Sequence, residues 1–249
     1  MTIKGEKILT QKQVCELGLD KVSVITANML KGYTSIGEGA FYNCTSLTSV
    51  TIPNSVTSIG RYAFGLCIHL TSVTFPNSVT SIGWSAFDSC IDLKSIEIPD
   101  SVTSIEKYAF AYCYDLTSVT IGNSVASIGG HAFYKCRGLA SVTLGDKTYE
   151  KQVIKDGKCK AYKGFNADMT CCDFQYKEGE TYEYEGEPKL CEKGFHACLN
   201  LADVFTYYCG KLGKDLVIHE VELEGVSDEC NEFDSKVVAK KITIGKRIL

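Results

Sequence analysis

The sequence predicts an α+β chain in which a β-rich repeat solenoid is followed by a small α+β domain. The first observation is a period of 23 residues that runs without a slip through residues 33–146. The second is that this period then stops, and the remaining residues carry helix and strand patterns of their own. A fixed period of this size is typical of a solenoid. We therefore expect an N-terminal cap (1–32), repeats (33–146), a connection (147–159) and a C-terminal α+β domain (160–249).

The repeat is defined by an Ala-Phe pair that recurs five times, with columns of cysteine, leucine and isoleucine at the same step. The pairs begin at Ala40, Ala63, Ala86, Ala109 and Ala132. Each repeat contains a segment such as residues 47–53 in which apolar and polar residues alternate, and this alternation predicts a short strand. A second extended run follows a turn. The pattern predicts five 23-residue coils, each with two short strands and an Ala-Phe corner.

The N-terminal segment lacks the repeat columns and is predicted to close the open end of the array. Residues 10–18 predict a short helix, with Thr10 as its N-cap, Gln13 completing a capping box and Gly18 ending it. Residues 22–25 predict a strand.

Thirteen cysteines suggest a disulfide framework until their positions are considered. Five fall in one repeat column, where neighbouring coils stack about 4.8 Å apart with parallel side chains, a geometry that does not favour the disulfide torsion. We expect a buried ladder of reduced thiols. An odd total agrees with a reducing compartment.

Composition argues against several classes of function. The net charge of −4 comes without a basic stripe, so we expect no nucleic acid as the main ligand. No run approaches the about 18 apolar residues of a membrane span, and residues 1–7 lack the apolar core of a secretory signal. We expect a cytoplasmic protein without membrane contact.

The repeat wording Ile-Gly-x-x-Ala-Phe-x-x-Cys-x-x-Leu-Thr-Ser-Val-Thr-Ile-Pro resembles the BspA-type leucine-rich repeat of bacterial surface proteins and some protist and phage proteins. Glu106 and Gly122 depart from it, where other repeats have glycine and proline. The resemblance implies a curved solenoid that binds other macromolecules, and it does not imply catalysis.

Because the repeats are near copies, the positions that differ between them are informative. The pairs that flank Ala-Phe and the cysteine are expected to be largely exposed, and they are rich in residue types found in binding hot spots. We hypothesise that a row of these side chains docks on a protein partner; the alternative is neutral drift on a tolerant edge. The predicted partner-binding residues are Arg61, Tyr62, Trp84, Lys107, Tyr108, Tyr112, His131 and Tyr134.

In the C-terminal region we expect strands at 160–165, 216–223 and 237–244, a hairpin within 174–184, and a helix at 200–208 capped by Asn200. Lys163-Gly164-Phe165, the run from Cys191 to Cys198 and Asp234-Ser235-Lys236-Val237 resemble an uncharacterised domain of phage and gut-bacterial proteins. That resemblance carries no known activity.

Three chemical hypotheses compete for the stretch 190–198. A metal site could use Cys191, His196 and Cys198 with one of Cys171, Cys172 or Cys209, although no common zinc spacing is present. A Cys-His nucleophile lacks a nameable orienting group. Lys163-Gly164, Gly194-Phe195-His196-Ala197 and Tyr207-Tyr208 are also similar in order to ADP-ribosyltransferase-like folds, with Glu220 or Glu222 as the catalytic candidate.

We expect a non-enzymatic protein-binding module without cofactors or a metal. A more specific hypothesis is that a phage or mobile element encodes the protein and that it inhibits a host defence protein in the host cytoplasm. One alternative is a C-terminal ADP-ribosyltransferase-like, nucleotide-binding enzyme that the repeats direct to its target. Another is a bacterial surface adhesin whose leader has been removed.

Overall fold

The computed structural model divides into two compact units, Met1–Thr148 and Tyr149–Leu249. It describes residues 6–172, 174–190, 195–208, 210–211, 215–227 and 235–248. Buried apolar side chains fill the interior of each unit. Among the described residues, no helix has the length and apolar character needed to cross a bilayer.

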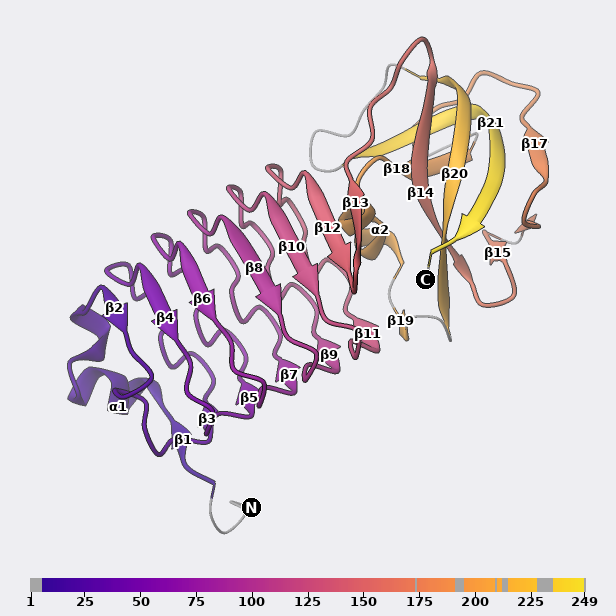
Figure 1. The fold of residues 1–249 in the computed structure, drawn as a ribbon. Coiled ribbons are helices and arrows are strands. Elements are labelled where there is room, and N and C mark those ends of the chain that lie inside the picture. The colour runs from indigo at the N-terminus through magenta and orange to yellow at the C-terminus, as the bar shows by residue number, and fades with distance from the viewer. Residues whose placement is uncertain are drawn as a thin grey trace. The chain divides into compact units, whose positions relative to one another are not determined.

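The first unit is a solenoid whose coils add one short strand to each of two parallel stacks (Figure 1). One stack contains β1 (Ile8–Leu9), β3 (Ser35–Ile36), β5 (Ser58–Ile59), β7 (Ser81–Ile82), β9 (Ser104–Ile105) and β11 (Ser127–Ile128). The other begins with a sheet of β2 (Val24–Ile25), β4 (Ser49–Thr51) and β6 (Ser72–Thr74) and continues with a second sheet of β8 (Ser95–Ile98), β10 (Ser118–Ile121) and β12 (Ser141–Leu144). After a two-residue turn, β13 (Lys147–Glu150) lies beside β12 at the end of this second sheet. The prediction of two short strands in each coil is confirmed.

The register of both stacks follows directly from the period. Ser35 lies opposite Ser58, and Val50 lies opposite Val73, so from β3 and β4 onward each paired residue of the repeats lies opposite its equivalent 23 positions away. A slip of one residue would turn the buried isoleucine of each short strand out of the core. The repeat columns therefore specify the stacking.

The Ala-Phe corners place a column of phenylalanine rings in the core. Neighbouring rings stack almost in parallel, with centroid distances of 5.1, 5.0, 5.2 and 5.6 Å from Phe41 to Phe133. All five rings are at most 2% exposed. Within a single coil the faces of the phenylalanine ring have no neighbouring ring to pack against. The ring faces are therefore buried only when coils stack.

The corners also hold residues in the left-handed backbone region. Tyr62 has a φ of 51°, Tyr108 of 58° and His131 of 63°. Such a conformation is costly for a residue that has a Cβ atom. Hydrogen bonds to the next coil offset this cost, because the backbone N–H of Tyr62 donates to the Trp84 carbonyl at 3.0 Å and that of Leu66 to the Asp88 carbonyl at 2.8 Å.

The N-terminal segment begins the solenoid as well as closing it. Helix α1 (Gln11–Glu16) has the predicted capping box between Thr10 and Gln13, and Gly18 follows it at a φ of 68°. A short 3-10 helix, η1 (Leu19–Lys21), comes next. The segment adds β1 and β2 to the two stacks through β3 and β4. The strand β1 had no signal in the sequence because the repeat columns start later.

The cysteine column is buried, as predicted. The Cys67 thiol donates to the Phe41 carbonyl at 3.0 Å, and the Cys90 thiol donates to the Phe64 carbonyl at 3.3 Å. Burial raises the pKa of Cys67 to about 12 and that of Cys44 to about 11. These thiols are therefore neutral and poor nucleophiles. The hydrogen bonds that Cys67 and Cys90 donate connect neighbouring coils.

The second unit is built on a sheet that closes on itself. β14 pairs with β18 and β20, and β21 pairs with both of these strands, which completes a ring. Phe165, Val217 and Ile242 pack in its core. Its elements are β14 (Lys158–Asn166), β15 (Thr170–Cys171), β16 (Phe174–Gln175), β17 (Thr181–Glu183), β18 (Phe195–Cys198), α2 (Leu201–Tyr207), β19 (Gly210–Lys211), β20 (Leu216–Val226) and β21 (Lys236–Arg247).

Most predicted elements of this unit are confirmed, including the three strands and the helix capped by Asn200, whose side chain accepts from the Ala202 N–H. The predicted hairpin within 174–184 is wrong. β16 pairs with β15, whereas β17 pairs with β21. The physical reason is that β21 is longer than β18, so the part of its edge at 241–243 is open to another strand, and β17 takes that place.

Candidate functional site

The side chains around the Ala-Phe pairs form a continuous row of rings along the repeat array, which we call the aromatic stripe. Tyr62 contacts Trp84 at a centroid distance of 4.8 Å, and Trp84 contacts Tyr108 at 6.3 Å. His131 continues the row at 5.1 Å from Tyr108. The stripe consists of Tyr42, Tyr62, Trp84, Tyr108, Tyr112, Tyr114, His131 and Tyr134.

Cationic side chains lie over several of these rings. The Arg61 guanidinium is 3.9 Å from the centroid of the Trp84 ring and 5.3 Å from that of Tyr62. The Lys135 ammonium lies 5.2 Å from the Tyr112 ring. Each such contact contributes roughly 0.5–1 kcal/mol at an exposed site. The stripe therefore presents cations and rings that already hold one another in place.

The structure brings together the six rings that the sequence analysis singled out, and Arg61 joins them, with exposed Lys107 next to Tyr108 in the chain. The expectation that these positions are largely exposed is wrong for the rings. All six are half-buried, because each ring packs on the next, mostly edge to face. Their contact surface is thus restricted to the outer edges and faces.

Two rings of the stripe were missed by sequence reasoning. Tyr42 is 40% exposed and 5.9 Å from Tyr62, and Tyr114 is 36% exposed and 6.2 Å from Tyr112. Both belong to the same variable pairs, so the signal was present. Their link to the row became visible only when the coils were stacked.

Asp88 is an acidic residue at a repeat position that carries a stripe tyrosine in two other coils. It occupies the column that holds Tyr42 and Tyr134 in other coils, and its Oδ1 atom is buried without a hydrogen-bond partner among the described residues. Burial raises the pKa of its carboxyl group to about 6, against an ordinary value of 3.8. The ionised form is therefore disfavoured in the folded protein.

We expect Asp88→Asn to stabilise the protein at neutral pH. Because the folded-state pKa lies above the unfolded one, the stability that depends on the neutral carboxyl group is present below about pH 4 and is lost as the pH rises to about 6. After a discount for partial exposure, the gain near pH 7 should be about 1 kcal/mol. Urea denaturation near pH 4 and near pH 7 checks this, and an equal effect at both values would contradict it.

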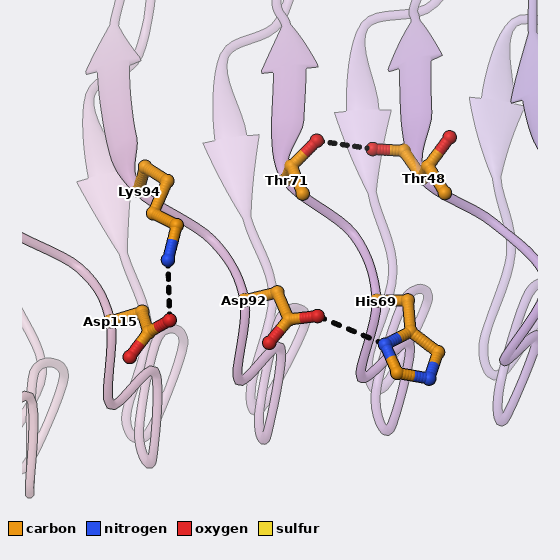
Figure 2. Close-up of polar contacts among 6 residues, drawn as sticks. All are labelled: Thr48, His69, Thr71, Asp92, Lys94 and Asp115. Atoms are coloured by element: carbon orange, nitrogen blue, oxygen red, sulfur yellow. Dashed lines mark hydrogen bonds and ion pairs between the residues drawn. The ribbon is translucent and has the colours of Figure 1, made fainter.

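The polar surface beside the strand stack is held by contacts between neighbouring coils (Figure 2). The Thr71 hydroxyl donates to the Thr48 carbonyl at 3.0 Å, His69 Nδ1 lies 2.9 Å from Asp92 Oδ2, and Lys94 pairs with Asp115. The equivalent hydroxyl groups of Thr48 and Thr117 also donate to a carbonyl of the preceding coil. The threonine column of Thr48, Thr71 and Thr117 therefore offers fewer unused donors to a ligand than its composition suggests.

The second unit contains a cavity of about 470 Å³. It is lined by Tyr162, Lys163, Asn166, Thr170, Cys171, Cys172, Tyr176, His196, Ala197, Cys198, Tyr207, Tyr208 and Lys236. Five positions of the transferase-like hypothesis meet in this lining: Lys163, His196, Ala197, Tyr207 and Tyr208. Neither Glu220 nor Glu222 is among the described lining residues, so the cavity lacks the carboxylate that this hypothesis assigned to it.

The metal hypothesis gains no support from the described residues. His196 and Cys198 both lie on β18, while Cys191 and Cys209 fall outside the residues that the structure describes. Within the described ranges, no group of three or more His, Cys, Asp or Glu side chains is arranged to hold a metal ion.

Two family models match the chain. Residues 34–154 match the BspA type leucine rich repeat region in six copies, one more than the Ala-Phe pairs define. Residues 159–249 match a domain of unknown function, DUF7666. No curated protein matches the chain.

Several solved structures are similar to the repeat array. A leucine rich repeat protein of T. pallidum is 35% identical over 49% of this chain, with a TM-score of 0.47. A leucine rich cell surface protein of Faecalibacterium prausnitzii is 37% identical, again over 49% of this chain and with a TM-score of 0.47. The matches cover 58% and 32% of those two chains.

The repeat columns, the two strand stacks and the family match all describe the same segment. Residues 34–154 are a BspA-type leucine-rich repeat region, and residues 159–249 form a domain of a family whose function is not known.

Proposed function

We propose that the chain is a non-enzymatic protein-binding module that contacts its partner through the aromatic stripe. The observation that carries this proposal is the unbroken row of half-exposed rings from Tyr42 to Tyr134, with Arg61 stacked on Trp84. Tyr, Trp and Arg are the residue types that dominate binding hot spots.

The rigidity of the stripe supports the same proposal. Tyr62 and Tyr108 have left-handed backbone conformations at the corners of their coils, and the backbone N–H of Tyr62 donates a hydrogen bond to the next coil. Each ring is also packed against a neighbour. Binding therefore orders few side chains, and such preorganisation lowers the entropic cost of association.

A finer form of the proposal is that the protein comes from a phage or another mobile element and inhibits a host defence protein in the host cytoplasm. Its support is the sequence resemblance to repeat and small-domain proteins of phages and gut bacteria. The neutral, buried thiols of Cys44 and Cys67 are compatible with a reducing compartment.

An affinity capture from a bacterial lysate tests the proposal, with the wild type beside a Tyr62→Ala/Trp84→Ala/Tyr108→Ala variant. A matched control carries Thr51→Ala/Thr74→Ala/Glu97→Ala, three exposed positions on consecutive coils of the strand stack. We expect one protein to be retained by the wild type and the control and to be lost from the stripe variant, with circular dichroism confirming that all three are folded. Equal retention by the stripe variant would refute the proposal.

A further inference from the structure

The cavity in the second unit contains a buried lysine. Lys163 is 4% exposed, and its ammonium donates to the His196 carbonyl at 2.9 Å. The Cys171 sulfur is 3.7 Å away, and the rings of Phe165 and Tyr176 lie at 5.5 and 5.6 Å. Lysine is almost never buried to this extent unless it is paired, because removing an ammonium from water costs several kcal/mol.

Among the described residues of the cavity lining, no carboxylate balances this charge, because none of them is Asp or Glu. Burial raises the pKa values of the Tyr176 and Tyr208 hydroxyls, so both are neutral near pH 7. A neutral carbonyl and aromatic faces compensate an ammonium only in part.

The walls of the cavity suit a flat or apolar body. The Tyr208 ring lies directly on Gly164, where a Cβ atom would approach the ring to 2.6 Å, so only glycine admits it. The Tyr208 hydroxyl reaches the Cys171 sulfur at 3.2 Å, and Lys236 adds a second cation over the Tyr207 ring at 4.2 Å. The volume of about 470 Å³ is in the range of small-molecule sites.

We propose that this cavity binds a small organic anion, whose carboxylate or phosphate group pairs with the Lys163 ammonium while its planar part packs against Tyr176 and Tyr208. The inference is independent of the aromatic stripe and assigns no reaction. It explains why a lysine is buried opposite an open volume rather than replaced by an apolar residue of similar size.

Calorimetric titration of the full chain tests this inference with four probes. AMP and benzoate carry a ring with a phosphate or a carboxylate, inorganic phosphate carries the charge alone, and adenosine carries a ring without charge. We expect saturable binding of AMP or of benzoate, with inorganic phosphate weaker and adenosine not binding. The ring-bearing anion that binds identifies which of the two anionic groups the site accepts.

Two variants complete the experiment. Lys163→Met keeps the side-chain volume and should weaken binding by about a hundredfold, whereas Lys160→Met, at an exposed position on the same strand, should leave it unchanged. Without a ligand, Lys163→Met should melt at the same temperature as the wild type or higher, because it removes a buried charge that is only partly compensated. The inference is overturned if no anionic probe binds the wild type, if adenosine binds as well as AMP, or if Lys163→Met binds normally.

Discussion

Phe87→Ala is expected to lower the free energy of unfolding of the repeat array by about 3–5 kcal/mol. Phe87 is fully buried and stacks between Phe64 at 5.0 Å and Phe110 at 5.2 Å, with Phe75 meeting it edge to face at 5.7 Å. Its removal opens a cavity and also breaks two stacked contacts. Because each coil is stabilised by its neighbours, a break at the centre separates the array into two shorter ones.

Urea denaturation followed by circular dichroism measures this loss. Phe87→Leu should cost less, since it fills most of the volume, and Phe174→Ala is a matched control because Phe174 is 45% exposed in the second unit. A cost below about 1 kcal/mol for Phe87→Ala would show that the ring column does not hold the coils together.

Trp84→Ala is expected to weaken binding of the captured partner by about 30-fold to 1,000-fold, which corresponds to about 2–4 kcal/mol. Trp84 is central to the stripe, because it contacts Tyr62 on one side and Tyr108 on the other and lies under Arg61. Its loss therefore removes a contact surface and also releases three neighbouring side chains.

Biolayer interferometry with the purified partner measures the affinity of this variant. Trp84→Phe, which retains a ring, should recover part of the affinity, and Arg61→Met should lose less than Trp84→Ala does. An unchanged dissociation constant for Trp84→Ala would place the binding surface elsewhere on the chain.

The architecture of the first unit could be predicted because one period specifies both the strands and their register. The isoleucine column that includes Ile36 and Ile59 determines which residues face the core. The constant 23-residue step determines which residues pair. The left-handed corners at Tyr62 and Tyr108 were not predicted. Apart from Gly39, these positions carry no glycine to mark a positive φ, and the hydrogen bonds that hold them exist only between stacked coils.

In the second unit, by contrast, the sequence pattern predicts strands without predicting how they pair. Alternation predicted β14, β20 and β21, but it does not state which strands pair, so the closed ring and the position of β17 were not predicted. The same limit applies to the cavity. Lys163 stands in a strand whose other polar residues, such as Lys160, are exposed, and only the pairing with β18 places its ammonium against the His196 carbonyl.

The central claim, that the aromatic stripe is the binding surface, is tested most directly by hydroxyl-radical footprinting of the chain with and without its captured partner. Hydroxyl radicals modify accessible aromatic side chains, so the extent of modification of the stripe residues measures their solvent exposure directly. We predict that the partner lowers the modification of Trp84, Tyr108 and Tyr114 and leaves that of exposed Phe174 unchanged. Protection of Phe174 with no change at Trp84 and Tyr108 would contradict this account.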